Sequence, residues 1–142
     1  MSQTLIIIPV FIQAMLTFIV LMAMGVARQQ SLRQANKSIE DTKLSGDKIW
    51  NEQAIKASNN FKNQFELPVL FYAVCAFALM TKSVDVLFLV LAFTFVLSRI
   101  AHSYFHLGSN RVSLRGGAYL VGFATLVAMW VILFARTAIS SL

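Results

Sequence analysis

The sequence contains few charged residues and few residues that break helices. Only 13% of its 142 residues are Asp, Glu, Lys or Arg, and it has two prolines, six glycines and one cysteine. Hydrophobic residues make up 58% of the chain, which is more than a soluble domain of this length can bury. This composition excludes the water-soluble globular class and is typical of a small polytopic membrane protein with one domain, residues 1–142. The lone Cys75 lies in an apolar segment, where a packing role is favoured over a nucleophile.

Four apolar runs account for most of the chain, at residues 5–27, 67–81, 86–98 and 117–135. A helix rises about 1.5 Å per residue and a membrane core is about 30 Å thick, so the second and third runs need flanking residues to span it. The runs predict an all-α, integral membrane four-helix bundle. We expect helices at about 5–27, 48–81, 84–106 and 117–136, with a loop at 28–47. No Lys or Arg precedes the first run, and no small-residue cleavage site follows, which predicts a retained helix and not a signal peptide.

The basic residues are distributed unevenly between the two sides of the predicted bundle. Seven Lys or Arg residues lie between the first and second runs, and Arg111 and Arg115 lie between the third and fourth. The opposite side has Lys82 and Arg136. The positive-inside rule therefore places both basic loops in the cytoplasm and both termini on the non-cytoplasmic side. The net charge of +6 is thus a topology signal, and no nucleic-acid partner is expected.

The segment before the second run has the periodicity of an amphipathic helix. Trp50, Ala54, Ala57 and Phe61 recur at spacings of four, three and four residues. The pattern continues without a breaker toward the second run. Pro68 can kink this helix without ending it, because membrane helices tolerate proline.

The opposite face of that helix carries Asn59, Asn63 and Glu66, and this polar face continues into the membrane. Counted along the helices from the turn at Lys82, Glu66 and Arg99 reach a similar depth inside the inner face. We therefore expect an interhelical Glu66–Arg99 ion pair. Two roles for this pair remain open: it orients the helices of the bundle, or it forms part of a ligand site.

Further polar residues follow Arg99 in the sequence. His102 and His106 lie on the same helical face, and two more arginines come just after. So many donors at one membrane face predict a site for an anionic ligand, although each histidine also has a purely structural interpretation. A small four-helix transporter is an alternative class. It is disfavoured because the first helix carries only Gln13 and the deep charges gather at one face.

These residues form a spaced pattern, and the predicted four-helix topology, length and orientation extend the resemblance described below over nearly the whole chain. Its parts are Asn63-x-x-Glu66, Arg99-Ile-Ala-His102, Leu107-Gly108, Arg111, Arg115 and Tyr119. The pattern resembles that of the MAPEG family, membrane-associated proteins in eicosanoid and glutathione metabolism. The family includes microsomal glutathione transferases and microsomal prostaglandin E synthase. The resemblance implies a homotrimer in a membrane, here the bacterial inner membrane, with an active site that faces the cytoplasm.

The resemblance also implies a chemistry and a set of site residues. It implies a glutathione-dependent transferase or peroxidase, which binds glutathione between subunits and takes a lipophilic substrate from the lipid. Arg115 matches the arginine that holds the glutathione thiol as a thiolate. The residues that match glutathione-binding positions are Arg28, Asn63, Glu66, Arg99, His102, Arg111 and Tyr119. Glutathione is the expected cosubstrate, and no metal site is expected.

Three positions depart from the usual pattern of that family. Asn59 stands where an arginine is often found, His106 where tyrosine is common, and Gly116 where a serine follows the catalytic arginine. The last departure argues against prostaglandin synthase activity. The departures leave a non-catalytic structural or regulatory membrane protein as the alternative function. Conjugation and hydroperoxide reduction both remain open, because each starts from the same thiolate.

Overall fold

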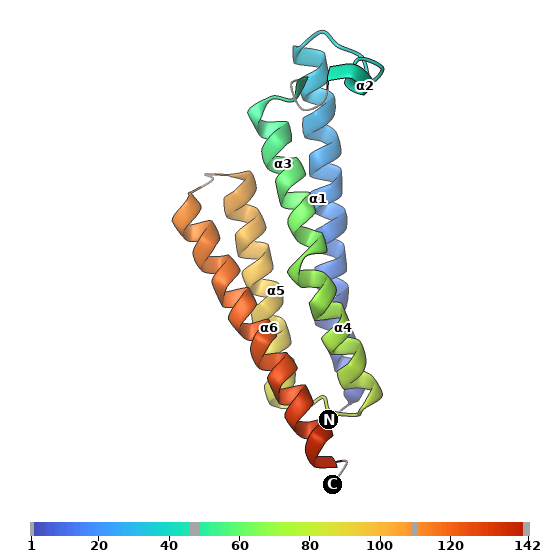
Figure 1. Ribbon diagram of the computed structural model, residues 1–142, viewed down its shortest axis with the longest axis vertical. Coiled ribbons are helices and arrows are strands. Elements are labelled where there is room, and N and C mark those ends of the chain that lie inside the picture. The colour runs from blue at the N-terminus through green and yellow to red at the C-terminus, as the bar shows by residue number, and fades with distance from the viewer. Residues whose placement is uncertain (1, 46–48, 109–110, 141–142) are drawn as a thin grey trace.

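The computed structural model describes residues 2–45, 49–108 and 111–140, which contain helices and no strands. The α-helices are α1 (Ile7–Gln34), α2 (Thr42–Ser45), α3 (Glu52–Lys62), α4 (Leu67–Met80), α5 (Val86–Leu107) and α6 (Val112–Ser140), and the 3-10 turns are η1 (Gln3–Ile6) and η3 (Asn63–Phe65). In Figure 1, α1 runs beside α3 and α4, and α5 runs beside α6. The segments long and apolar enough to cross a membrane are Gln3–Gln34, Glu52–Met80, Val86–Leu107 and Val112–Ile139. The predicted all-α, four-helix architecture is therefore confirmed.

The apolar core lies between α4, α5 and α6, toward the end of the bundle where η1 begins and α6 ends (Figure 1). The rings of Phe71 and Phe95 stack there with their centroids 4.4 Å apart. Large apolar side chains on the outer faces, such as Phe11 and Phe134, are exposed. A surface of this kind suits hydrocarbon and not water.

The amphipathic helix predicted before the second apolar run is observed as α3. Ala54 and Ala57 are buried and pack with Ala27 of α1. The side chain of Asn51 caps the helix, because its Oδ1 accepts a hydrogen bond of 2.9 Å from the backbone N–H of Ala54. Small residues at this contact allow the backbones of α1 and α3 to approach each other closely.

The helix expected at 48–81 is interrupted at residues 63–66, and its expected start at residue 48 lies outside the described residues. After η3, Glu66 has φ −97° and ψ −101°, which is not a helical conformation. The cause is Pro68. It has no amide hydrogen to donate to the carbonyl of Gln64, and its ring restricts the residue before it. The interruption changes the helical phase between α3 and α4.

The first helix is longer than expected, because residues 28–34 belong to α1 and not to a loop. No glycine or proline interrupts this segment, and Ser31 and Leu32 are buried. The Ser31 hydroxyl accepts a 2.8 Å hydrogen bond from the backbone N–H of Asn51 and donates one of 3.3 Å to the carbonyl of Ile49. These contacts hold the end of α1 against the start of α3.

The last helix also begins earlier than expected, at Val112 and not at residue 117. Gly116 and Gly117 do not end it, although each glycine costs a helix about 1 kcal/mol relative to alanine. The backbone N–H of Arg115 donates a 3.1 Å hydrogen bond to the carbonyl of Arg111. Arg115 therefore lies in the first turn of α6, and the helix sets the direction of its side chain.

A row of buried polar side chains crosses the bundle between α1, α3 and α5. The Gln13 amide donates to Gln64 Oε1 at 3.1 Å, and the Gln64 amide donates to the Ser103 hydroxyl at 3.2 Å. That hydroxyl donates to Asn60 Oδ1, also at 3.2 Å. Interhelical hydrogen bonds of this kind hold membrane helices in register. The partners of Gln13 do not follow from its sequence spacing, because they lie on other helices.

The helices α5 and α6 approach each other closely at Gly122, where an added Cβ would lie 2.5 Å from the Ser98 hydroxyl oxygen. We expect Gly122→Ala to destabilise the protein by about 1 kcal/mol, because Ser98 must give up its hydrogen bond to the Phe95 carbonyl. In a Ser98→Ala background the same change should be neutral or stabilising, since alanine favours a helix over glycine. Thermal unfolding in detergent measures both effects.

A matched control for this contact is Gly25→Ala in α1, where an added Cβ meets nothing within 4 Å. That variant should unfold at the wild-type temperature or slightly above it. Equal losses of stability for Gly122→Ala in the two Ser98 backgrounds would contradict the close approach of α5 and α6.

Asp85 links the start of α5 to the end of α6. Its Oδ1 accepts a 2.8 Å hydrogen bond from the backbone N–H of Phe88, and its Oδ2 accepts one of 2.5 Å from the guanidinium of Arg136. The Arg136 hydrogen bond, followed by that from Phe88, holds the pKa of Asp85 below its ordinary value. The carboxylate is therefore more stable in the folded protein than in the unfolded chain.

We expect Asp85→Asn to lower the free energy of unfolding by less than about 1 kcal/mol at neutral pH, because both partners of the ion pair are partly exposed. The contribution of Asp85 is present above its unfolded pKa of 3.8 and is lost as the pH falls through the lower folded value. The stability difference between wild type and variant should therefore stay constant from about pH 7 to about pH 5 and shrink as the pH falls further, through the folded pKa. Asparagine keeps the helix cap, so a difference that persists unchanged at low pH would not come from this ion pair.

Candidate functional site

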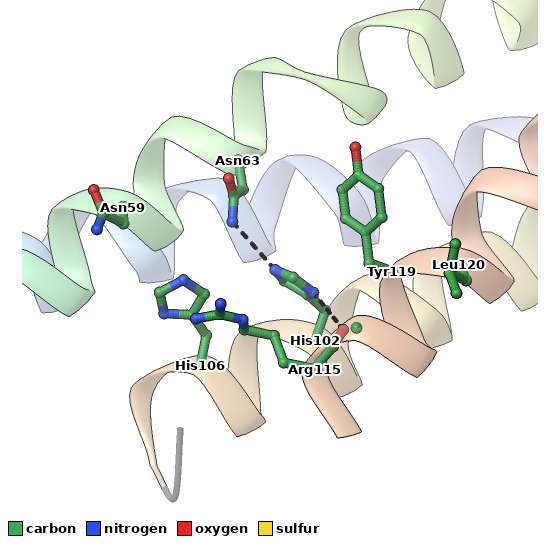
Figure 2. Close-up of a pocket in the computed structure, with 8 residues that line it drawn as sticks. Asn59, Asn63, His102, His106, Arg115, Tyr119 and Leu120 are labelled. Carbon is green, nitrogen blue, oxygen red and sulfur yellow. Dashed lines mark hydrogen bonds between the residues drawn. The ribbon is translucent and has the colours of Figure 1, made fainter. Parts of the chain in front are cut away.

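A polar cavity of about 530 Å³ lies between α3, α5 and α6. Its lining consists of Asn59, Asn63, His102, His106, Arg115, Gly116, Tyr119 and Leu120. Figure 2 shows polar side chains from three directions around this space: asparagines from α3 and its end, histidines from α5, and Arg115 and Tyr119 from α6. A cavity of several hundred Å³ with convergent polar groups has the size and character of a small-molecule site.

His102 occupies the centre of this arrangement and has a partner on each ring nitrogen (Figure 2). The Asn63 amide nitrogen lies 3.2 Å from Nε2, so the amide donates and Nε2 accepts. Nδ1 lies 3.1 Å from the backbone carbonyl of Arg115, to which the Nδ1–H donates. The two bonds together require a neutral ring with its proton on Nδ1. The histidine therefore ties the end of α3 to the first turn of α6.

Arg99 lies next to the cavity and its side chain is fully buried. Its guanidinium is 5.6 Å from the centre of the Tyr119 ring, and one nitrogen donates a 3.2 Å hydrogen bond to the carbonyl of Asn63. Its Nε and Nη1 have no hydrogen-bond partner within the described part of the chain. A buried guanidinium with two unpartnered nitrogens is costly unless another group compensates its charge.

The predicted Glu66–Arg99 ion pair is not formed. Between described residues the ion pairs are Lys43–Glu40, Lys56–Glu52 and Arg136–Asp85. Glu66 is exposed, and its carboxylate acts on Arg99 only at longer range. The prediction is wrong because it matched the depths of the two residues and not the directions that they face. Glu66 follows Asn59 by two helical turns, and both are exposed. Arg99 is buried, and its guanidinium lies against the Asn63 carbonyl.

We expect Glu66→Gln to leave the thermal stability of the protein close to that of wild type, since no buried pair is broken. An exposed carboxylate typically contributes less than about 1 kcal/mol. Thermal unfolding in detergent checks this result. A loss of about 3 kcal/mol or more would instead indicate a buried partner for Glu66.

Asn63, His102, Arg115 and Tyr119 are the predicted site residues that line the cavity. The other four predicted residues do not line it: Arg99 lies next to it, Glu66 is exposed, and Arg28 and Arg111 lie elsewhere. Arg28 stacks 5.2 Å above the Trp50 ring and donates a 2.9 Å hydrogen bond to the Ser58 hydroxyl. Arg111 is exposed just before α6 and does not contribute to the lining.

Four further residues line the cavity without matching a glutathione-binding or catalytic position of the family pattern: Asn59, His106, Gly116 and Leu120. The signal for His106 was present, because it follows His102 by one helical turn. Asn59 likewise precedes Asn63 by one turn. Gly116 and Leu120 flank predicted residues of α6, but their character gave no reason to select them.

The cavity has a positive electrostatic environment. Arg115 lines it, the uncompensated charge of Arg99 lies behind Tyr119, and Lys56 acts on His106 from α3. Lys56 is itself paired with Glu52, so the two arginines are the main source of the field. This environment favours a ligand with negative charge.

A comparison with protein-family models gives one match, to the MAPEG family, over residues 6–135. No curated protein and no solved structure gave a significant match. The matched residues include the four potential membrane spans almost completely and every residue that lines the cavity. Together with the apolar outer faces of the helices, this match identifies an integral, multi-pass membrane protein. Because a single family model accounts for nearly the whole chain and for its polar cavity, the protein belongs to the MAPEG family of membrane proteins in glutathione and eicosanoid metabolism.

Proposed function

We propose that the protein is a membrane-bound, glutathione-dependent transferase or peroxidase that uses the cavity between α3, α5 and α6. The observation that carries the proposal is the convergence of Arg115, His102, Asn63 and Tyr119 on one polar cavity of about 530 Å³. Four of the residues matched to glutathione-binding or catalytic positions thus meet at one place. Membership of the family supports the same chemistry.

Arg115 is the residue that we assign to the glutathione thiol. A free thiol has a pKa of about 8.5, so only a few per cent of it is thiolate at neutral pH. A fixed cation beside the sulfur lowers that pKa and raises the nucleophilic fraction. Arginine suits the role because it stays charged even where solvent is partly excluded.

The other lining residues supply binding and orientation. The Asn63 side chain and the Tyr119 hydroxyl can hydrogen-bond the peptide, and His102 keeps the first turn of α6 in place. Arg99 contributes positive charge that a carboxylate of the peptide would compensate.

A homotrimer is part of the proposal, because Arg28, Glu66 and Arg111 do not line the cavity of their own chain. Glu66 and Arg111 are exposed, so either can reach the cavity of a neighbouring subunit. In a trimer, a site between two subunits would include residues that do not line the cavity of their own chain.

We propose that the second substrate is lipophilic and enters from the membrane. Leu120 lines the cavity and is also 65% exposed on the outer face of α6, so it connects the cavity with the lipid. The positive-inside rule places the cavity end of the bundle in the cytoplasm, and the proposed location is the bacterial inner membrane.

The test is the binding of glutathione to the purified protein in detergent. We expect saturable binding, together with thiolate absorbance at about 240 nm at neutral pH. An analogue with a methyl group in place of the thiol should bind without that absorbance. A lack of saturable binding would contradict the proposal and favour a non-catalytic member of the family. Parallel assays with a chlorodinitrobenzene-type electrophile and a fatty-acid hydroperoxide then distinguish conjugation from peroxide reduction.

A further inference from the structure

A second cavity, of about 380 Å³, lies between α1, the segment that leads into α2, and Trp50. It shares no lining residue with the polar cavity, and we call it the Arg28 pocket. Its lining is mostly apolar and includes Gly25, Leu32, Ile39 and Trp50. An added Cβ at Gly25 would meet nothing within 4 Å, so the pocket is open on that side. Ile39 is 72% exposed, which suits a membrane surface better than water.

Arg28 supplies a fixed positive charge to this pocket. Its guanidinium lies 5.2 Å from the centre of the Trp50 ring, and one nitrogen donates a 2.9 Å hydrogen bond to the Ser58 hydroxyl. The ion pairs between described residues do not include Arg28. A guanidinium has five N–H donors, so donors remain for an anion in the pocket once Ser58 is satisfied. The pocket therefore combines a cation, an indole ring and apolar walls.

Arg28 also lies at the depth of the lipid head groups. Counted from Leu5, about 20 residues of helix cross the hydrocarbon core, which places its inner edge near Gly25 and Arg28 about 5 Å beyond it. Counted back from the turn at Lys82, about 20 residues along α4 and α3 reach the same edge near Lys62. Two helices thus place the pocket in the head-group layer, at the end of the bundle where α1 ends and α3 begins (Figure 1).

The chemistry of the pocket distinguishes between possible anions. Glutathione is a polar peptide with two carboxylates, whereas this pocket offers one guanidinium and mostly apolar walls. A free phosphate ion would leave the apolar walls without a partner. An anion that carries acyl chains satisfies both parts, and at this depth the membrane itself supplies such molecules.

We propose that the Arg28 pocket binds one anionic phospholipid of the cytoplasmic leaflet. The phosphate accepts hydrogen bonds from Arg28, and the acyl chains leave the pocket past Gly25 into the hydrocarbon. The segment that carries Ile39 covers the head group. The pocket is separate from the polar cavity, so this inference does not depend on the proposed function.

The test measures how much phosphatidylglycerol raises the unfolding temperature of the full-length, delipidated protein in an uncharged detergent. Phosphatidylcholine with the same acyl chains is the zwitterionic reference. We expect a saturable rise, with an apparent affinity for phosphatidylglycerol at least about fivefold higher than for phosphatidylcholine. Equal responses to the two lipids would overturn the inference.

Arg28→Gln should weaken the binding of phosphatidylglycerol at least about tenfold, because it removes hydrogen bonds between charged groups. The matched control is Arg33→Gln, which removes the same charge from an exposed position of α1 outside the pocket. At an ionic strength of about 0.15 M this control should change the affinity less than about threefold, since exposed charges are screened. Equal losses in both variants would indicate diffuse attraction and overturn the site.

Gly25→Leu tests the pocket without altering Arg28. Its Cβ meets no neighbour, so the protein should fold, while the leucine side chain obstructs the path of the acyl chains and weakens the binding of phosphatidylglycerol about tenfold. An affinity equal to that of wild type would contradict the proposed path.

Two further ligands identify the source of the anion. Glycerol phosphate should not stabilise the protein at concentrations at which phosphatidylglycerol saturates, and equal stabilisation would overturn the assignment to a lipid. Stabilisation by glutathione should persist in Arg28→Gln. If it is lost while the response to phosphatidylglycerol persists, Arg28 belongs to a glutathione site and the inference is wrong. A wild-type protein that responds to phosphatidylglycerol and not to glutathione would contradict only the proposed function.

Discussion

Arg115→Ala is expected to lower turnover at pH 7 about tenfold, with a much smaller effect on the affinity for glutathione. In our proposal the guanidinium stabilises the thiolate, so its removal returns the pKa of the bound thiol toward the solution value. A change of one pKa unit corresponds to about 1.4 kcal/mol of thiolate stabilisation. Titration of the thiolate absorbance of the bound complex with pH measures the shift directly.

The matched control for this prediction is Arg111→Ala. Arg111 lies one helical turn before Arg115 but is exposed and outside the lining of the cavity. Its removal should leave the titration curve of bound glutathione unchanged. If Arg111→Ala abolishes the shift while Arg115→Ala retains it, the assignment belongs to Arg111. The alignment of this sequence with the family pattern would then be wrong by one helical turn in this region.

Arg99→Met is expected to keep or raise the stability of the ligand-free protein, while it removes the stabilisation by glutathione. Two nitrogens of the Arg99 guanidinium are buried with no partner among the described residues, so its charge is a cost in the absence of ligand. Replacing a poorly compensated buried charge with an apolar side chain of similar volume is often neutral or stabilising by about 1–4 kcal/mol. Thermal unfolding with and without glutathione measures both effects.

Arg136→Met provides the contrast for Arg99→Met. Arg136 donates hydrogen bonds to the Asp85 carboxylate and to the carbonyl of Ser83, so its replacement should destabilise the protein. The glutathione-dependent increase in unfolding temperature should persist in this variant, because Arg136 lies at the other end of the bundle from the cavity. If Arg99→Met lost as much stability as Arg136→Met, another subunit or group must already compensate the charge of Arg99.

The number and approximate position of the long helices could be predicted from the amino-acid sequence. Their apolar runs are local features that do not depend on a partner. Helical spacing near one membrane face also predicted that Asn63, His102 and Arg115 lie close together, whereas Tyr119 was implied only by the resemblance to the family pattern. The prediction of the amphipathic helix α3 was also correct, because it rested on local spacing: Ala54 and Ala57 lie on one helical face, and both are buried.

The partners of the polar residues inside the bundle depend on how the helices pack together. Gln64 lies on the same helical face as the buried Ala57 and Asn60, but only packing against α1 and α5 brings it to Gln13 and Ser103. Glu66 lies on the exposed face, so its depth along the helix did not predict its separation from Arg99. Contacts across the chain also place Arg28 over Trp50, away from the cavity, and leave Nδ1 of His106 with no hydrogen-bond partner in the described ranges. A side chain's partners depend on the helices that pack beside it, whereas its place on its own helix depends only on local spacing.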